Sequence, residues 1–268
     1  MGRTLDYTVN CSLLFTELPL AERPRAAREA GFSNVEFWWP FADAVPPRGE
    51  VDAFVTAIEA AGVRLTGLNL FAGVLPGPDR GILSHPGRGA ESEANAELVA
   101  RIAQRTGTTA FNALYGLRLA GVDPAEQDRL ALENTVAAAR VLAAVGGTVL
   151  VEPLSGVEGY PLRTAAEALA FVARAREAGA DNVALLADLY HLAVNGDDVA
   201  AVVRDHAAEF GHVQIADAPG RGEPGTGALP LERLVTDARA HGYRGLVSLE
   251  YLPTVPTRES FGWLDSWE

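Results

Sequence analysis

The sequence predicts a (β/α)₈ TIM barrel, an α/β fold in which residues 1–268 form a single domain. Three observations lead to this prediction. Apolar runs of strand length alternate with longer helical patterns about eight times, and eight such units fit a chain of about 260 residues. The runs are nearly continuous in apolar residues, as in a parallel sheet covered by helices. Most helical stretches end at a glycine, the residue that commonly follows a helix C-terminus.

The predicted strands and helices follow one another in a regular order. The strands are TVNCSLLF (8–15), NVEFWW (34–39), VRLTGLNL (63–70), TAFNALYG (109–116), TVLVE (148–152), VALLAD (183–188), HVQIAD (212–217) and GLVSLE (245–250). The amphipathic helical stretches between them span 20–31, 51–62, 91–107, 131–147, 164–179, 199–211 and 229–242. No domain boundary interrupts this order. The loop 73–89 is long for a barrel and is expected to act as a lid, and residues from about 252 to 268 are expected to form a C-terminal extension.

A doubly wound open sheet is the competing architecture, and its glycine-rich dinucleotide motif should follow the first strand. Nothing suitable stands there. The segment GRGEPG (220–225) fits G-x-G-x-x-G, but it follows the seventh strand, contains Pro224 and opens no helix. We therefore expect no dinucleotide cofactor. A glycine-rich loop at this place in a barrel instead predicts a floor for a small anionic substrate.

Composition excludes several classes of protein. With 22 basic and 35 acidic residues, the net charge is −13, so neither nucleic acid nor an anionic membrane surface is an expected partner. The single cysteine, Cys11, excludes internal disulfides and multi-cysteine zinc sites. No signal-like N-terminus and no apolar run approaching 18 residues is present, which predicts a cytoplasmic protein. The chain contains no lysine, which excludes Schiff-base chemistry, lysine-anchored pyridoxal phosphate and a P-loop lysine.

Four polar side chains stand at or near the C-terminal ends of the last four predicted strands: Glu152, Asp188, Gln214 and Glu250. Burying a carboxylate there is unfavourable unless it is paired, hydrogen-bonded or bound to a metal. Side chains at these ends of a barrel meet at its catalytic face. Hard oxygen ligands without a thiolate suit Mg²⁺ or Mn²⁺. The pattern therefore predicts a divalent-metal site.

Other polar and aromatic residues follow the same strands. His191, three residues after the sixth strand, is placed to donate a hydrogen bond to a substrate oxygen. His212 shares a strand face with Gln214 and is expected to line the barrel at a deeper level. Arg221, after the seventh strand, suits the capture of a carboxylate. Trp38, after the second strand, is equally compatible with a pocket wall and with the core.

These residues lie in segments that carry a resemblance to a known family. The runs NCSLLFTELPLAERPRAAREAGFSNVEFWWPF, VEPLSG, DLYH, HVQIADAPGRGEPGTG and LEYLP resemble the hydroxypyruvate isomerase family, within the xylose isomerase-like barrels. The resemblance extends over nearly the whole chain, and QIADAPGRGEPGTG is its most specific block. It implies a (β/α)₈ fold and a divalent metal, Mg²⁺ or Mn²⁺, held by Glu152, Asp188, Gln214 and Glu250, with no organic cofactor.

The resemblance also implies a mechanism. Glu152 and Glu250 would form the acid/base pair, and His191 and Arg221 would contact substrate, with Asn69 also assigned to substrate binding. The expected reaction is an aldose–ketose isomerisation of a short hydroxy-keto acid, hydroxypyruvate to tartronate semialdehyde. The metal would stabilise an enediolate while one glutamate removes a carbon-bound proton.

Two segments depart from the family pattern. The usual N-L-P-A-G-D reads NLFAGV at 69–74, so its acid is lost, and E-P-I-N reads EPLS at 152–155. Both lie in loops expected to cover the substrate, so the identity of the substrate stays open. Besides a hydroxypyruvate isomerase, the chain is compatible with a 2-oxo-tetronate isomerase or a ketose 3-epimerase. A metal-dependent dehydratase or lyase and a non-catalytic sugar-binding barrel are alternatives of other classes. A homo-oligomer is compatible with each.

Overall fold

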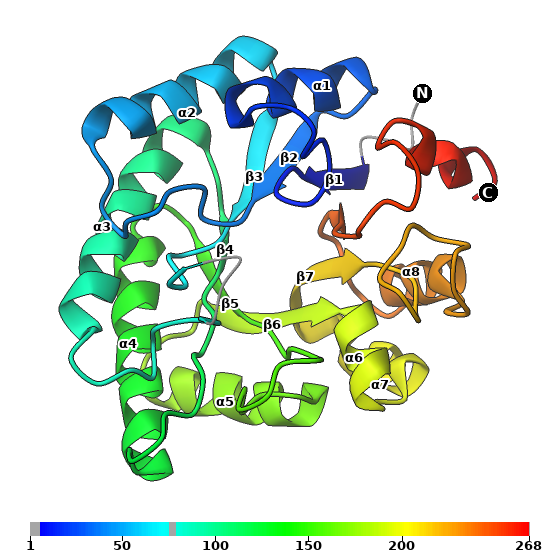
Figure 1. Cartoon of the computed structure of the whole chain (residues 1–268). Helices are drawn as coiled ribbons and strands as arrows, with labels where there is room; N and C mark the ends of the chain where they lie inside the picture. Colours follow the sequence, from blue (N-terminus) through cyan, green and yellow to red (C-terminus); the bar gives the residue numbers. More distant parts are fainter. Residues whose placement is uncertain (1–5, 75–78, 268) are drawn as a thin grey trace.

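Eight parallel strands close into a barrel in the order β1 to β8, with β1 paired to both β2 and β8. The computed structural model describes residues 6–74 and 79–267. At least one helix lies between each strand and the next, and the helices surround the ring of strands (Figure 1). The predicted (β/α)₈ barrel is confirmed. That residues 1–268 form a single domain stays a prediction.

The strands are shorter than most of the predicted runs. They are β1 Tyr7–Asn10, β2 Asn34–Phe37, β3 Arg64–Leu68, β4 Ala110–Asn112, β5 Thr148–Val151, β6 Val183–Asp188, β7 Phe210–Ile215 and β8 Val247–Leu249. The predicted strand 8–15 was wrong beyond position 10, where β1 ends, and the predicted strand 109–116 was wrong beyond position 112, where β4 ends. Apolar residues beyond these ends, such as Leu14 and Leu114, are buried in the loops, so an apolar run does not mark where pairing stops.

The helices match the predicted stretches, with two differences. They are α1 Arg23–Glu29, α2 Arg48–Ala61, α3 Gly89–Thr106, α4 Pro124–Ala143, α5 Ala165–Glu177, α6 Leu189–Asn195, α7 Val199–His206 and α8 Leu231–Ala240. Helix α4 begins at Pro124 rather than near 131, because Asp123 caps it by accepting a hydrogen bond from the backbone N–H of Ala125 at 2.9 Å. Helix α6 was not predicted, and its N-cap is Asp188 itself.

The layer between strands and helices is apolar. Outward strand residues such as Val9, Val35 and Leu185 are fully buried there against the helices. None of the helices within residues 6–74 and 79–267 combines the length and the apolar character that a membrane span needs. The C-terminal segment adds to the packing, because Trp263, in the 3₁₀ helix Glu259–Asp265, meets Tyr7 edge-on at 5.6 Å between ring centroids.

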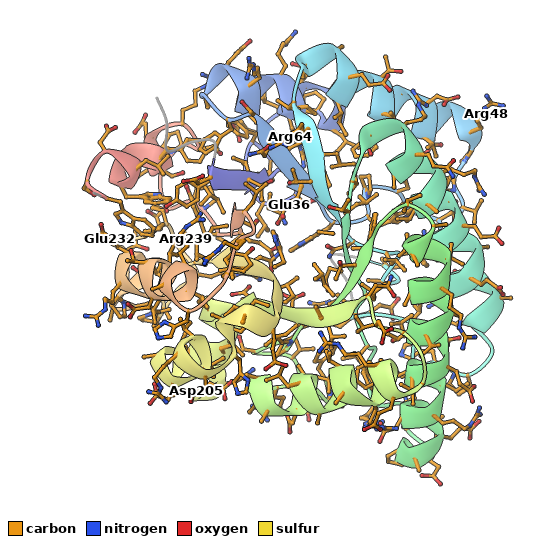
Figure 2. The ribbon with its side chains drawn as sticks, turned by 180° about the vertical axis from the view of Figure 1, so that it is seen from behind. Glu36, Arg48, Arg64, Asp205, Glu232 and Arg239 are labelled. Carbon is orange, nitrogen blue, oxygen red and sulfur yellow. The ribbon has the colours of Figure 1, made fainter. Side chains whose placement is uncertain are left out.

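The interior of the barrel is largely polar. Glu36 on β2 accepts hydrogen bonds from Asn10 on β1 and Ser248 on β8, and it pairs with His212 on β7. Figure 2 shows Glu36 pointing into the space enclosed by the strands, whereas Arg48 lies on the outer surface. Barrels of this fold usually fill their interior with branched aliphatic side chains. The polar interior therefore marks the region where chemistry is to be sought.

Candidate active site

The four predicted strand-end residues converge at one end of the barrel. Glu152 follows β5, Asp188 ends β6, Gln214 lies in β7 and Glu250 follows β8. All four are at most 4% exposed. They meet because the parallel register places Asp188 opposite Gln214. The prediction that these side chains share one site is thus supported by their position, while their roles as ligands stay a prediction.

Two buried oxygens in this group lack a hydrogen-bond partner. Within residues 6–74 and 79–267, neither Asp188 Oδ2 nor Gln214 Oε1 accepts a hydrogen bond. Leaving such an atom unsatisfied costs about 1–3 kcal/mol, more when it is charged. One ligand atom each from Glu152, Asp188 and His191 also lies within 4.8 Å of the others. A buried group of hard oxygen donors with free lone pairs fits a divalent cation.

Glu152 and Glu250 favour the protonated state when no cation is present. Burial, with the charge of Asp188 added, raises the pKa of Glu152 to about 8, although Asn112 Nδ2 donates to its Oε2 at 2.6 Å. Burial also raises the pKa of Glu250 well above its usual value, against the opposing charge of Arg221. Clustered buried carboxylates resist ionisation together. A bound divalent cation would remove this penalty.

His191 lies in the first turn of α6, next to the acids. The helix start is fixed by Asp188, whose Oδ1 accepts hydrogen bonds from the backbone N–H groups of Tyr190 at 2.9 Å and His191 at 3.2 Å. The backbone N–H of Ser155 donates to His191 Nδ1 at 3.1 Å, and Ser155 Oγ lies 2.7 Å from the same atom. Burial lowers the pKa of His191 to about 4. The ring is therefore neutral, and because Nδ1 accepts, its proton is on Nε2.

Arg221 reaches the site from the loop after β7. Its Nη2 donates to Glu250 Oε1 at 2.7 Å and lies 3.8 Å from Asp188 Oδ2. The guanidinium carbon stands 5.7 Å from the centre of the Tyr190 ring. Arg221 adopts φ 59°, a left-handed backbone conformation that non-glycine residues rarely adopt. Such a conformation persists only where the surrounding loop imposes it.

The loop that carries Arg221 is held by Asp217. The Asp217 carboxylate accepts hydrogen bonds from four backbone N–H groups at 2.9 Å each, those of residues 218, 225, 227 and 229. At Gly227 a Cβ would lie 2.3 Å from the carbonyl oxygen of Ala218, so only glycine fits. The sequence interpretation included Arg221 but missed Asp217. Its signal was the short motif ADAPGRGEPGTG, in which one acid precedes several glycines.

A cavity of about 270 Å³ lies beside these side chains. Its lining includes the predicted Asn69, Glu152, His191, Arg221 and Glu250, together with Trp38, Leu114, 154–157 and Arg80. Trp38 is thus a pocket residue. Arg80 comes from the described part of the predicted lid loop 73–89, of which residues 75–78 lie outside the described residues. Neither Arg80 nor Ser155 was singled out from the sequence.

The residue that sequence reasoning missed most clearly is Glu36. It is 3% exposed, and its Oε2 lies 2.9 Å from His212 Nε2. Burial acts to raise the pKa of Glu36, but the charge of His212 and hydrogen bonds from its neighbours outweigh it, so the pKa is lowered. The available signal was a charged residue inside the apolar run NVEFWW. His212 lines the barrel below Gln214, as strand alternation predicted.

Comparison with known proteins places the chain among sugar isomerase relatives. A family model described as xylose isomerase-like TIM barrel matches residues 24–267. A Streptomyces coelicolor protein with the provisional name hydroxypyruvate isomerase is 56% identical over 264 residues, 96% of this chain and 95% of that protein. The 2-oxo-tetronate isomerase of Cupriavidus necator is 32% identical over 260 residues, 96% of each chain. A crystal structure from Brucella melitensis, described as an AP endonuclease of family 2, superposes with a TM-score of 0.88 at 31% identity, covering 98% of this chain and 99% of its own.

Proposed function

The chain belongs to the hydroxypyruvate isomerase family of xylose isomerase-like TIM barrels, and from that premise we propose that it is a metal-dependent isomerase of a short hydroxy-keto acid. The proposed reaction converts hydroxypyruvate to tartronate semialdehyde. The observation that carries the proposal is a pair of buried oxygens that accept no hydrogen bond within the described residues, Asp188 Oδ2 and Gln214 Oε1. Leaving these two oxygens buried without a partner destabilises the fold, and a bound cation would remove that penalty.

Mg²⁺ or Mn²⁺ would be held by Glu152, Asp188, Gln214 and Glu250. When bound, such an ion supplies Lewis-acid polarisation of neighbouring substrate oxygens. His191 stays outside this ligand set, although it lies close enough to join it, because its Nε2 carries a proton and offers no lone pair. That N–H is a donor for a substrate oxygen.

Glu152 and Glu250 are proposed as the acid/base pair. One carboxylate takes the proton from C3 of hydroxypyruvate, which leaves an enediolate, and a proton is returned to C2 from the other side. The hydroxyl hydrogen of O3 is given up and O2 gains one, so that the product is an isomer of the substrate. Glu250 is oriented for this by Arg221 on one oxygen and by Asn10 Nδ2, 3.0 Å away, on the other.

The pocket suits a small carboxylate. Its volume of about 270 Å³ lies just below the usual range for ligand cavities, which fits a three- or four-carbon substrate. Two arginines, Arg80 and Arg221, line it, and a guanidinium is suited to a carboxylate. Asn69 lines the same cavity and is proposed to contact substrate.

The second candidate is 2-oxo-tetronate isomerisation, favoured by the identity to the Cupriavidus protein and by a cavity that admits one more carbon. A ketose 3-epimerase, a metal-dependent dehydratase or lyase, and a silent sugar-binding barrel remain alternatives for the same pocket. A DNA-directed activity is not proposed, because a net charge of −13 opposes binding to nucleic acid. A cytoplasmic location and a homo-oligomeric state stay predictions.

An NMR panel in D₂O tests the proposal. Hydroxypyruvate, 2-oxo-tetronate and several ketoses are incubated separately with the protein and Mg²⁺ or Mn²⁺. We expect conversion of hydroxypyruvate with deuterium entering at the reacting carbons, and loss of both in Glu250→Gln. Turnover of 2-oxo-tetronate alone would establish the second candidate. Epimerisation of a ketose, loss of water, or binding without turnover would each contradict the proposal.

A further inference from the structure

The side-chain amide of Gln214 has a chemical ambiguity. An amide presents an oxygen on one side and an NH₂ group on the other, and only the oxygen ligates a metal. In the structure Gln214 Nε2 donates to two carboxylates, Glu36 Oε1 at 3.3 Å and Glu250 Oε2. Its Oε1 is buried and has no partner within the described ranges. The observed orientation is therefore the one that leaves the oxygen for a cation.

The opposite orientation of the Gln214 amide would also satisfy a buried acceptor. Asp188 stands in register with Gln214 on the neighbouring strand, and its Oδ2 also lacks a hydrogen-bond partner among the described residues. A Gln214 NH₂ group turned toward Asp188 would place a donor near that oxygen and would leave the Gln214 oxygen facing Glu36 and Glu250. Some feature of the molecule must therefore hold the NH₂ group on the other side.

Glu36 is held rigidly enough to do this. Its Oε2 pairs with His212 Nε2 at 2.9 Å, and its Oε1 accepts from Ser248 Oγ and from Asn10 Nδ2 at 3.2 Å. The amide of Asn10 is itself fixed, because its oxygen accepts from the backbone N–H of Ser12 at 3.0 Å. Glu36 also sits close against β3, since a Cβ on Gly67 would lie 3.0 Å from its Oε2. The acceptor facing Gln214 is thus anchored from three strands.

We propose that Glu36 is a positioning residue that selects the metal-binding orientation of the Gln214 amide. Its carboxylate accepts one N–H of Gln214 while Glu250 accepts the other, and a carboxylate cannot accept from the amide oxygen. The Gln214 oxygen is therefore directed away from Glu36 and toward the cation site. This inference rests on the proposed metal site.

The test uses Mn²⁺ alone as the probe, with the full chain treated with a chelator and measured by calorimetric titration. Glu36→Gln keeps the shape of the side chain but gives the Gln214 NH₂ group an ambiguous partner. We expect Mn²⁺ affinity to fall by about 10- to 100-fold, the usual effect of removing a residue that orients a metal ligand. Thr8→Val is the matched control, because it removes one partly buried hydrogen bond between strands, to Thr66 at 2.8 Å, that does not involve Glu36. Its Mn²⁺ affinity should stay within about twofold of the wild type.

A double exchange separates orientation from general stability. In Glu36→Gln/Gln214→Glu the metal-facing side chain has two equivalent oxygens and needs no orientation, and the amide introduced at position 36 can donate to it. We expect Mn²⁺ affinity to recover to within about tenfold of the wild type. If Glu36 only supported the barrel, the recovery would be no larger than the gain that Gln214→Glu alone gives over the wild type.

The outcomes are distinguishable. If the wild type binds no Mn²⁺, both the proposed metal-dependent function and this inference fail. If the wild type binds Mn²⁺ and Glu36→Gln binds it equally well, or the double exchange is no better than Glu36→Gln, only the inference fails. If Glu36→Gln does not fold, Ser248→Ala replaces it, because it removes one of the three donors that hold Glu36 Oε1 without a change of charge. Ser248→Ala should weaken Mn²⁺ binding by about three- to tenfold, and unchanged binding would overturn the inference.

Discussion

Two groups of buried acids lie inside the same barrel and differ in how their oxygens are satisfied. Near β2, Glu36 has a histidine on one oxygen and three donors on the other, and its pKa is lowered. Near the ends of β5 to β8, Glu152 and Glu250 have raised pKa values, and Asp188 keeps an oxygen without a partner in the described parts of the chain.

Burial does not explain this difference. Glu36 is 3% exposed, and Glu152, Asp188 and Glu250 are 4%, 1% and 2% exposed. The difference lies in the neighbours. His212 pairs with Glu36 alone, whereas the other three acids share one arginine, Arg221. The lesson is that a buried carboxylate that stands apart from other acids and has every oxygen used is part of the scaffold. A buried cluster with oxygens left over is a candidate for chemistry.

The largest expected effect comes from a change in the group of acids at the strand ends. Glu250→Gln keeps the size of the side chain but removes the base, so kcat/KM for hydroxypyruvate should fall by about 10³-fold, or about 4 kcal/mol of transition-state stabilisation. The melting temperature in chelator should change by no more than about 5 °C, because the gain from removing a carboxylate with a raised pKa opposes the loss from turning an NH₂ group toward the donors to Glu250. Steady-state kinetics and thermal unfolding check both. A variant as fast as the wild type would place Glu250 with Glu36, in the scaffold.

Metal removal addresses the unpartnered oxygens directly. Mn²⁺ at 100 times its Kd should stabilise the chelator-treated protein by about 2.7 kcal/mol, which raises the unfolding temperature by roughly 5–10 °C. Asp188→Asn should lose most of this shift, because its Oδ2 is one of the free acceptors. Scanning calorimetry with and without Mn²⁺ provides the measurement. An equal shift in both proteins would mean that the ion binds elsewhere.

A third change tests whether an acid outside the cluster, with hydrogen bonds to both of its oxygens, belongs to the scaffold. Asp217 accepts four backbone N–H groups, so it resembles Glu36 rather than Glu250. Asp217→Asn turns an NH₂ group toward two of those donors and should cost about 2 kcal/mol of stability. Because the loop carries Arg221, KM should rise more than kcat falls. Denaturant unfolding and kinetics report these two effects, and a fall in kcat alone would assign Asp217 a different role.

The meeting of the strand-end acids was the part of the site that could be predicted from the sequence. Glu152, Asp188 and Glu250 stand where apolar runs stop, and the parallel order of a barrel brings such ends together without any knowledge of side-chain contacts. The closed barrel followed from the same alternation of strands and helices. Strand ends were less accurate, because buried loop residues such as Leu14 and Leu114 continue the apolar pattern past the last paired residue.

The scaffold half could not be predicted in the same way. Glu36 and His212 are 176 positions apart, and their pairing depends on the diameter of the barrel and on side chains that point inward from strands that are not neighbours. Asp217 was hidden for a similar reason, since its partners are backbone groups of one folded loop. The role of Ser155 could not be predicted either, because it depends on α6, which places His191 beside it.

The smallest expected effect concerns the histidines of the two groups. His212 pairs with an acid, whereas His191 Nδ1 pairs with Ser155 and is kept neutral by burial. Ser155→Ala removes the hydroxyl 2.7 Å from Nδ1 but keeps the backbone N–H that donates to it, so kcat/KM should fall by about fivefold, close to 1 kcal/mol. Nitrogen NMR of the ring should find the proton on Nε2 in both proteins. A proton on Nδ1 would make Nε2 a free lone pair, and His191 would then join Glu152 and Asp188 as a metal ligand rather than donate to substrate.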